Sequence, residues 1–163
     1  MNIFSIYFEK IKKFLIDLEK DKQIKLSDNF NKLTIELPPK DLQGDISCNA
    51  ALVLSKINNK KPKDIAILLK TNLIKKFPEF KNIFIAEPGF LNIEFNEDFW
   101  QKFLNDLLNL KEKYGSNSSK KNKYNVEFVS ANPTGPLHVG HCRGAILGDV
   151  ITNLLTFNGN EVS

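Results

Sequence analysis

Residues 125–149, NVEFVSANPTGPLHVGHCRGAILGD, decide the fold of the later part of this chain. Apolar runs lie on both sides of a loop that contains proline and glycine, and both histidines of the protein, His138 and His141, follow that loop. The pattern predicts a buried strand at 124–129, an extended loop at 130–136, a helix from 137 to about 157, and a strand beginning at 160–163. Strand, loop, helix and strand in this order open a parallel α/β fold of the nucleotide-binding kind.

The two histidines lie where the carboxyl end of a strand meets the first turn of a helix, the position at which open α/β sheets bind ligands. Residues three apart share a helix face, so both imidazoles can point at one ligand. Free N–H groups there favour an anion such as phosphate. Gly140, between the histidines, leaves a bare surface on which a flat ring such as adenine could lie. A structural role for the histidines and metal binding are the alternatives, the second weaker because no third ligand accompanies the pair.

The sequence before this stretch predicts helices packed on a small antiparallel sheet. Apolar residues at helical spacing, an N-cap at Asp45 and a first-turn proline at Pro62 indicate the helices, while Pro88 and Gly89 indicate a tight hairpin. The expected helices span 3–20, 45–57, 62–76 and 97–113, and the expected strands span 32–37, 82–87 and 90–95.

Residues 115–123, GSNSSKKNK, form a polar and lysine-rich stretch that predicts a linker. The expected organisation is an α+β domain at 1–114, this linker, and the beginning of an α/β Rossmann-like domain at 124–163. One or two strands cannot bury the helices of an α/β sheet, so we expect the chain to be part of a longer protein.

The composition excludes several classes. A hydrophobic fraction of 42% with 26% charged residues is typical of a soluble globular protein, and no apolar run is long enough to span a bilayer. A cytoplasmic location is expected, since the N-terminus lacks the features of a secretory signal. Cys48 and Cys142 are far apart, which predicts two buried thiols and neither a zinc site nor a disulfide. Every lysine lies before residue 124, and this excess can attract a phosphate backbone.

The stretch FVSANPTGPLHVGHCRGA resembles the signature region of class I aminoacyl-tRNA synthetases, whose HIGH motif is written here as HVGH. The flanking ANPTGP is similar specifically to arginyl-tRNA synthetases. GDISCNAALVLSK and AEPGFLNIEF resemble that family's N-terminal domain, which contacts the outer corner of tRNA at the D-loop. The resemblance covers nearly the whole chain. It implies an arginine–tRNA ligase that uses ATP with Mg2+, L-arginine and tRNA(Arg), with no metal site in the protein, no membrane association and a monomeric state.

The resemblance also implies roles for individual residues. His138 and His141 match the motif that stabilises attack of the amino-acid carboxylate on the α-phosphate of ATP. The implied ATP-binding residues are Thr134, Pro136, His138, Gly140 and His141. The implied arginine-binding residues are Glu127, Ser130, Asn132 and His141, with the Glu127 carboxylate near the guanidinium. Phe90 and Asn92 match positions that touch a D-loop base by stacking and hydrogen bonding.

Two features of the family have no counterpart in the chain, namely a lysine loop of the KMSKS type and a helical anticodon-binding domain. The family also needs tRNA to activate its amino acid, so we expect this polypeptide alone to be inactive. The residues alone leave two alternative functions open. One is a nucleotidyltransferase with HxGH at the same turn, although such enzymes carry it close to the N-terminus. The other is a stand-alone RNA-binding module, which would bind tRNA through residues 1–123 and need no ATP.

Overall fold

The computed structural model describes residues 2–26, 30–116, 121–132 and 134–163. Pro133 and residues 117–120 of the predicted linker lie outside the described residues. Residue contacts divide the chain into two units, 2–109 and 110–163. The domain boundary predicted at 115–123 stays a prediction, and each unit is described by itself.

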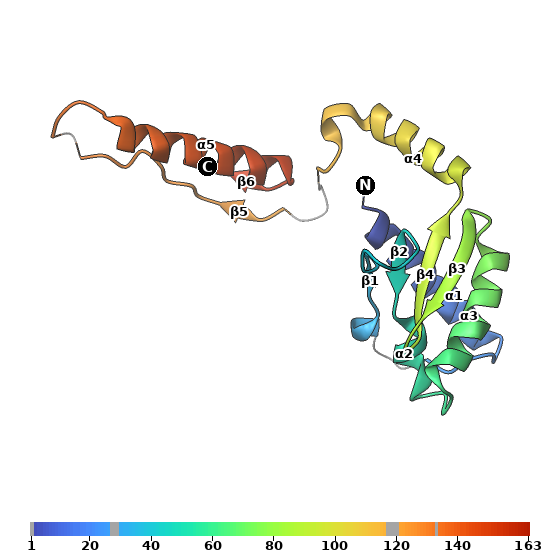
Figure 1. Ribbon diagram of the computed structural model, residues 1–163. Coiled ribbons are helices and arrows are strands. Elements are labelled where there is room, and N and C mark those ends of the chain that lie inside the picture. Colours follow the sequence, from blue (N-terminus) through green and yellow to red (C-terminus); the bar gives the residue numbers. More distant parts are fainter. Residues whose placement is uncertain (1, 27–29, 117–120, 133) are drawn as a thin grey trace. The chain divides into compact units, whose positions relative to one another are not determined.

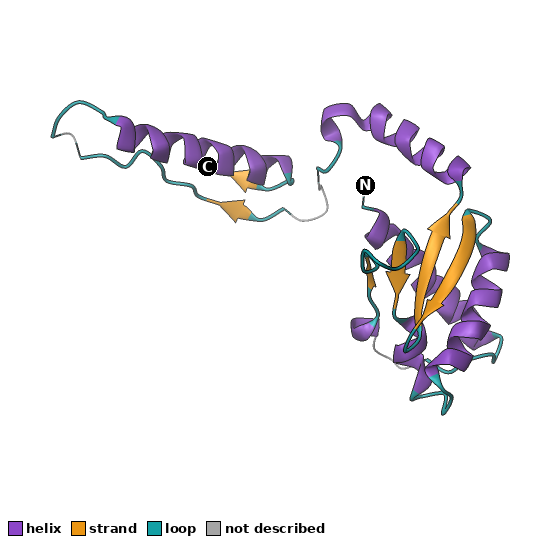
Figure 2. Ribbon diagram, in the orientation of Figure 1, coloured by secondary structure: helices purple, strands orange, loops and turns teal. Residues whose placement is uncertain are grey.

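The first unit is an α+β domain, as the sequence predicts (Figures 1 and 2). Its helices are α1 (Ile3–Lys20), α2 (Ala50–Ser55), α3 (Pro62–Lys76) and α4 (Glu97–Leu110). Its strands are β1 (Ile35–Glu36), β2 (Ile46–Cys48), β3 (Phe80–Ala86) and β4 (Phe90–Phe95), which pair antiparallel in the order β1-β2-β4-β3. A single 3-10 turn occupies Phe30–Lys32, and another, Lys111–Lys113, lies at the beginning of the second unit.

The core lies between one face of this sheet and the helices. Alternate residues of β4, namely Leu91, Ile93 and Phe95, are buried among the apolar residues of α1, α2 and α3. Tyr7 of α1 packs its ring 4.7 Å from that of Phe95, and its hydroxyl donates to Glu79 Oε1 at 3.0 Å. Burial, followed by the nearby carboxylate, raises the pKa of this hydroxyl far above its ordinary value. Tyr7 therefore serves as a permanent donor.

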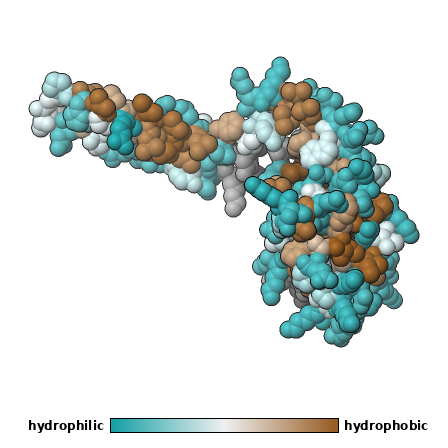
Figure 3. All heavy atoms as spheres, in the orientation of Figure 1, coloured by the Kyte–Doolittle hydropathy of each residue, from teal (hydrophilic) through white to brown (hydrophobic). Residues whose placement is uncertain are grey.

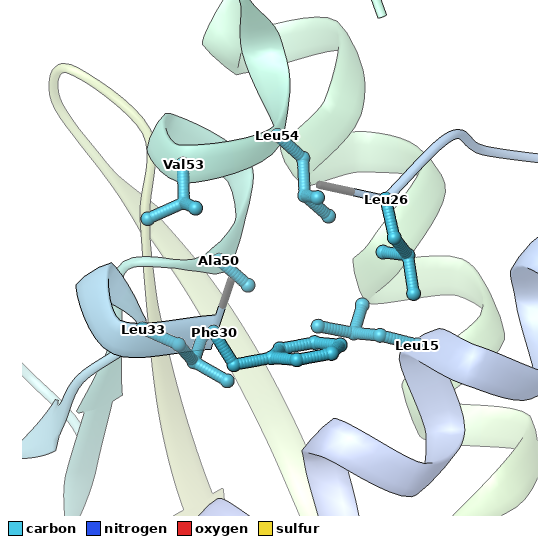
Figure 4. A pocket seen from close by; sticks show the side chains of 7 residues that line it. All are labelled: Leu15, Leu26, Phe30, Leu33, Ala50, Val53 and Leu54. Atoms are coloured by element: carbon cyan, nitrogen blue, oxygen red, sulfur yellow. The ribbon is translucent and has the colours of Figure 1, made fainter. Parts of the chain in front are cut away.

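A small apolar cavity remains between α1, α2 and the segment that precedes β1 (Figure 4). Its volume is only ≈ 10 Å³, so it is a packing gap that could admit about one water molecule. Its lining is entirely apolar and is made by Leu15, Leu26, Phe30, Leu33, Ala50, Val53 and Leu54. A void with no polar partner stays dry, so we assign it no function.

The other face of the sheet is polar at its centre. One row crosses all four strands: Glu36 pairs with Ser47, Ser47 with Asn92, and Asn92 with Phe84. Ser47 and Asn92 are buried, and the Asn92 Oδ1 atom has no hydrogen-bond partner among the described residues. Buried polar groups almost always have partners, so this face invites a functional explanation.

The helix predicted at 45–57 is wrong at its start. Ile46, Ser47 and Cys48 are all buried in a short central strand, and α2 begins only at Ala50. Asp45 caps no helix, because its Oδ2 accepts from the Phe95 N–H at 2.7 Å across the sheet. Three consecutive buried residues have no strand alternation, which is why helical periodicity appeared to fit.

Other elements differ in length or burial. The strand predicted at 32–37 pairs only at Ile35–Glu36, and the last residues of the helix predicted at 97–113 form a 3-10 turn. Burial raises the pKa of the Cys48 thiol to about 12, so this cysteine is inert. Cys142 is exposed, against the prediction of two buried thiols.

The second unit contains β5 (Lys123–Tyr124), α5 (Val139–Phe157) and β6 (Glu161–Val162). The two strands pair in parallel, which confirms the predicted opening of an α/β fold. The strand predicted at 124–129 is shorter and begins one residue earlier, because it pairs with β6 only at Lys123 and Tyr124. Val129, beyond it, has φ +58, a conformation that interrupts an extended chain. In the described parts of the chain, no helix is long and apolar enough to cross a bilayer.

Apolar side chains are exposed along α5 (Figure 3). They are Val139, Ile146, Leu147, Val150, Ile151, Leu154 and Phe157. Only Gly148 of this helix is buried, where it meets Phe128. The N-terminal end of α5 is therefore positioned by local contacts and not by a core of its own.

Candidate functional site

The two predicted histidines cap the N-terminus of α5 reciprocally. His138 is the N-cap residue, and its Nδ1 accepts from the Gly140 N–H at 3.1 Å. The backbone N–H of His138 donates in turn to Nδ1 of His141 at 3.1 Å. The ring centroids lie 3.9 Å apart, so the structure brings the pair together. The arrangement is a capping box in which imidazoles take the places usually held by Ser or Thr and Glu.

These hydrogen bonds fix the chemistry of both rings. A ring nitrogen that accepts a backbone N–H cannot carry a proton, so the proton of each neutral imidazole lies on Nε2. Both histidines therefore offer an Nε2–H donor, while their Nδ1 atoms hold the helix end. The sequence alone predicted free N–H groups for an anion at this helix end. The Gly140 N–H is not free, because it donates to Nδ1 of His138. The negative charge of a bound anion would instead be stabilised by hydrogen bonds from the two Nε2–H groups.

Gly140 has a second role besides leaving a bare surface. A Cβ at this position would lie 2.9 Å from Cε1 and 3.0 Å from Nδ1 of His138. Any side chain would push the His138 ring out of its cap. The predicted contact of Gly140 with an adenine ring stays a prediction.

An open pocket of ≈ 410 Å³ lies between the loop that follows β5 and the start of α5. This volume is typical of small-molecule sites. The pocket is lined by Ser130, Ala131, Asn132, Thr134, Gly135, Pro136, His138 and His141. It thus unites the predicted ATP-binding residues Thr134, Pro136, His138 and His141 with the predicted arginine-binding residues Ser130 and Asn132.

Glu127 does not line this pocket. It is exposed and lies on the segment between β5 and the loop, three residues before Ser130. Sequence reasoning missed Val129, whose strained backbone turns the chain from that segment into the loop, and Gly148, whose missing side chain admits Phe128. A valine gives no sequence signal for a positive φ, and strain of this kind is found mainly at functional sites.

The other predicted contact residues, Phe90 and Asn92, line a separate pocket of ≈ 170 Å³ on the polar face of the sheet. Its other lining residues are Glu36, Leu37, Pro39, Leu42, Ser47, Ala86 and Glu87. Asn92 belongs to this lining, and its buried Oδ1 has no hydrogen-bond partner among the described residues. Proteins recognise an unstacked base by stacking it on an aromatic ring and forming hydrogen bonds to its edge, and Phe90 and Asn92 are residues of these two types. Ser47 carries no motif that would have identified it from sequence.

The described residues include no group of three or more His, Cys, Asp or Glu side chains placed to hold a metal ion. The chemistry that the described residues offer is that of hydrogen-bond donors, backbone dipoles and apolar walls. Arg143, the only arginine of the protein, is exposed in the first turns of α5.

Two family models match this chain. Residues 7–95 match the family described as "Arginyl tRNA synthetase N terminal domain". Residues 103–163 match the family described as "tRNA synthetases class I (R), catalytic domain". The two matches fall on the two regions that hold the two pockets.

Named relatives agree with these matches. The chain is 48% identical to an arginine–tRNA ligase of Pelagibacter ubique over 100% of its own length, and 42% identical to one of Rhizobium etli over 99%. It spans 28% of the length of each of these curated relatives.

Solved structures agree as well. The arginyl-tRNA synthetase of Thermus thermophilus matches with TM-score 0.50 and 25% identity over 94% of this chain and 24% of that one. The arginyl-tRNA synthetase of Plasmodium falciparum matches with TM-score 0.61 over 94% of this chain and 29% of that one. Its sequence identity is 21%, so this match supports the fold alone.

Proposed function

The chain belongs to the arginyl-tRNA synthetase family, and we propose that it serves an arginine–tRNA ligase in two ways. Residues 2–109 contact the outer corner of tRNA(Arg), and the region from β5 to α5 forms part of the site that activates arginine with ATP. The observation that carries the proposal is the imidazole capping box, which holds two histidines by their Nδ1 atoms in the lining of an open pocket and leaves each an Nε2–H donor.

The activation step needs positioning and charge stabilisation. A carboxylate oxygen of arginine attacks the α-phosphorus of ATP, the bond from that phosphorus to the bridging oxygen breaks, and pyrophosphate leaves with the electron pair. The phosphoryl oxygens gain charge in this step, and preorganised donors stabilise it. The Nε2–H groups of His138 and His141 supply such donors without losing a proton, because their Nδ1 atoms stay bound to the backbone.

The remaining residues take the roles that the family implies. Thr134, Pro136 and Gly140 bind ATP, which enters as its Mg2+ complex, and Ser130 and Asn132 bind the amino-acid end of arginine together with His141. Glu127 would pair with the guanidinium. Its exposed place outside the pocket lining means that the loop or further residues must complete the arginine site. The predictions of a monomer and of a cytoplasmic location stay predictions.

In the first unit, the pocket of Phe90 and Asn92 receives a base of the tRNA D-loop. The base stacks on Phe90 and forms a hydrogen bond with the side chain of Asn92, both of which line the pocket. A buried acceptor without a partner costs free energy, so this site favours a ligand that donates a hydrogen bond.

The test is a chimera in which this chain replaces the aligned 28% of the Pelagibacter ubique relative. We expect arginine-dependent ATP–pyrophosphate exchange that needs tRNA and falls about 100-fold or more in His141→Ala, since one lost donor costs that much. Cys142→Ala, at the adjacent exposed position, should leave the rate nearly unchanged. An inactive chimera beside an active relative, or exchange that survives His141→Ala, would contradict the ligase. Exchange with a phosphate acceptor other than arginine would favour the nucleotidyltransferase.

A further inference from the structure

The connection between α2 and α3 carries a concentrated positive charge. Lys56, Lys60, Lys61 and Lys63 lie within residues 56–63, here termed the basic loop, and no acidic residue occurs between Asp45 and Asp64. All four side chains are exposed. Within residues 2–26, 30–116, 121–132 and 134–163, none of the four forms an ion pair. These cations are available to a ligand.

The basic loop packs against the turn between β3 and β4. A Cβ at Gly89 would lie 2.8 Å from Cβ of Pro62 and 3.5 Å from Cδ2 of Leu52. With φ at +154 and no room for a side chain, Gly89 lets the two segments touch. Figure 1 shows that the β3–β4 turn and the start of α3 lie at the same end of the domain. The next residue, Phe90, is the aromatic ring of the base pocket.

The basic loop is held in a fixed conformation. The Asn58 side chain accepts from the Lys25 N–H at 2.8 Å and donates to the carbonyls of Lys25 at 2.9 Å and Leu54 at 2.8 Å. This bracket joins the loop to the segment after α1 and brings the backbone of Lys25, another exposed lysine, beside it. A loop anchored in this way presents its charges with little further ordering cost.

The neighbouring pocket cannot bind the backbone of a nucleic acid by itself. Its lining holds Glu36 and Glu87 and no cation, so a phosphate at its mouth would be repelled. A base can enter only if the phosphates on either side of it find positive charge outside the pocket. The basic loop is a cationic segment whose Pro62 packs against Gly89, the residue before Phe90.

We propose that the basic loop is a phosphate-binding track for the RNA strand whose unstacked base occupies the pocket of Phe90 and Asn92. This inference rests on the proposed tRNA contact of that pocket. The track positions the strand through its phosphates, and the pocket supplies the base contact, a division of labour common in nucleic-acid recognition. The two contributions differ in salt dependence, because only the lysines release counterions.

The test measures fluorescence anisotropy of a labelled tRNA(Arg) transcript titrated with the whole 163-residue chain at several salt concentrations. The variant is Lys60→Gln with Lys61→Gln. The matched control is Lys75→Gln with Lys76→Gln, an exposed lysine pair at the other end of α3, about 20 Å away along the helix. We expect the Lys60/Lys61 variant to weaken binding about tenfold and to reduce the slope of log Kd against log salt by about 1 to 1.5. The control should change Kd by no more than about twofold.

Phe90→Ala and a transcript that lacks the loop base separate the possible failures. The lysine effect should persist on the base-free transcript, while the effect of Phe90→Ala should disappear there. Equal losses from both lysine pairs would overturn the track, since they would indicate diffuse attraction. A loss from Phe90→Ala with none from Lys60 and Lys61 would overturn the track and leave the tRNA contact standing. Indifference of tRNA binding to every variant would overturn the contact itself and the track with it.

Discussion

The two units of this chain achieve order in different ways. In residues 2–109, a sheet and three helices enclose a continuous core in which Ile83, Leu91 and Ile93 have no exposed surface. In residues 110–163, the longest helix buries only Gly148 and leaves seven large apolar side chains exposed. The second unit nevertheless holds the capping box with its defined hydrogen bonds. The geometry of a site can thus be set by local contacts where burial contributes little.

The contrast should appear first in hydrogen exchange. Amides of α3 and β4 open only with the core, whereas amides of α5 can open locally because few apolar contacts restrain them. In the intact chain we expect exchange of α5 amides to be about 1,000-fold faster or more than that of β4 amides. Measurement by mass spectrometry or NMR would decide this. Comparable protection in both elements would show that the second unit is stabilised by contacts not described above.

A matched pair of isoleucine substitutions tests the same contrast energetically. Ile93 is fully buried and Ile151 is 40% exposed. Ile93→Ala should lower the free energy of unfolding of the first unit by about 3 to 4 kcal/mol, because it opens a cavity in a packed core. Ile151→Ala should cost less than about 1 kcal/mol. Urea denaturation of the intact chain measures both, and equal costs would remove the distinction between the units.

Glycine substitutions address the local contacts of α5. A Cβ at Gly148 would overlap the ring of Phe128, whereas nothing lies within 4 Å of one at Gly144. Gly148→Ala should therefore displace Phe128 and destabilise the packing of its segment on α5 by about 1 to 3 kcal/mol. Gly144→Ala should stabilise the helix by up to about 1 kcal/mol, since alanine is the better helix former. Helix content by circular dichroism during denaturation compares the two, and a loss from both variants would contradict the steric explanation.

The sequence predicted the parts of this molecule that depend on local periodicity and turn chemistry. The bounds of α1 and α3 are as predicted, and the hairpin of β3 and β4 turns at Gly89. The prediction failed at β2, whose burial on both faces depends on partners distant in sequence. It also overextended the strand before the site, since β5 pairs with β6 only at Lys123 and Tyr124, and nothing in the residue type of Val129 indicates its positive φ.

The candidate site shows the same division. The HxGH spacing predicted that the two imidazoles share one helix end, but their reciprocal capping, which leaves the proton on each Nε2, depends on the backbone geometry of that end. The pocket of Phe90 and Asn92 follows from strand register, which brings Ser47 and Glu36 into line with them. Residues that meet only through pairing of distant strands leave no local pattern to read.

The smallest expected effect distinguishes two ion pairs. In the first unit, Glu79 accepts from Lys10 at 2.8 Å and from Tyr7, and its side chain is only 20% exposed. In the second unit, Glu161 lies 3.4 Å from Lys123, with both side chains mostly exposed. Glu79→Gln should cost about 1 kcal/mol near neutral pH and Glu161→Gln almost nothing, because exposed pairs gain little.

The stabilisation that Glu79 contributes should depend on pH. Burial by itself raises the pKa of Glu79, but the hydrogen bonds from Lys10 and Tyr7 outweigh it and hold the pKa below its ordinary value in the folded state. The stabilisation is therefore complete above the pKa of an unfolded glutamate and is lost as the pH falls through the folded pKa. The difference in unfolding free energy between the native chain and Glu79→Gln should shrink over that acidic range. A difference that stayed constant with pH would mean that Glu79 acts through packing and not through its charge.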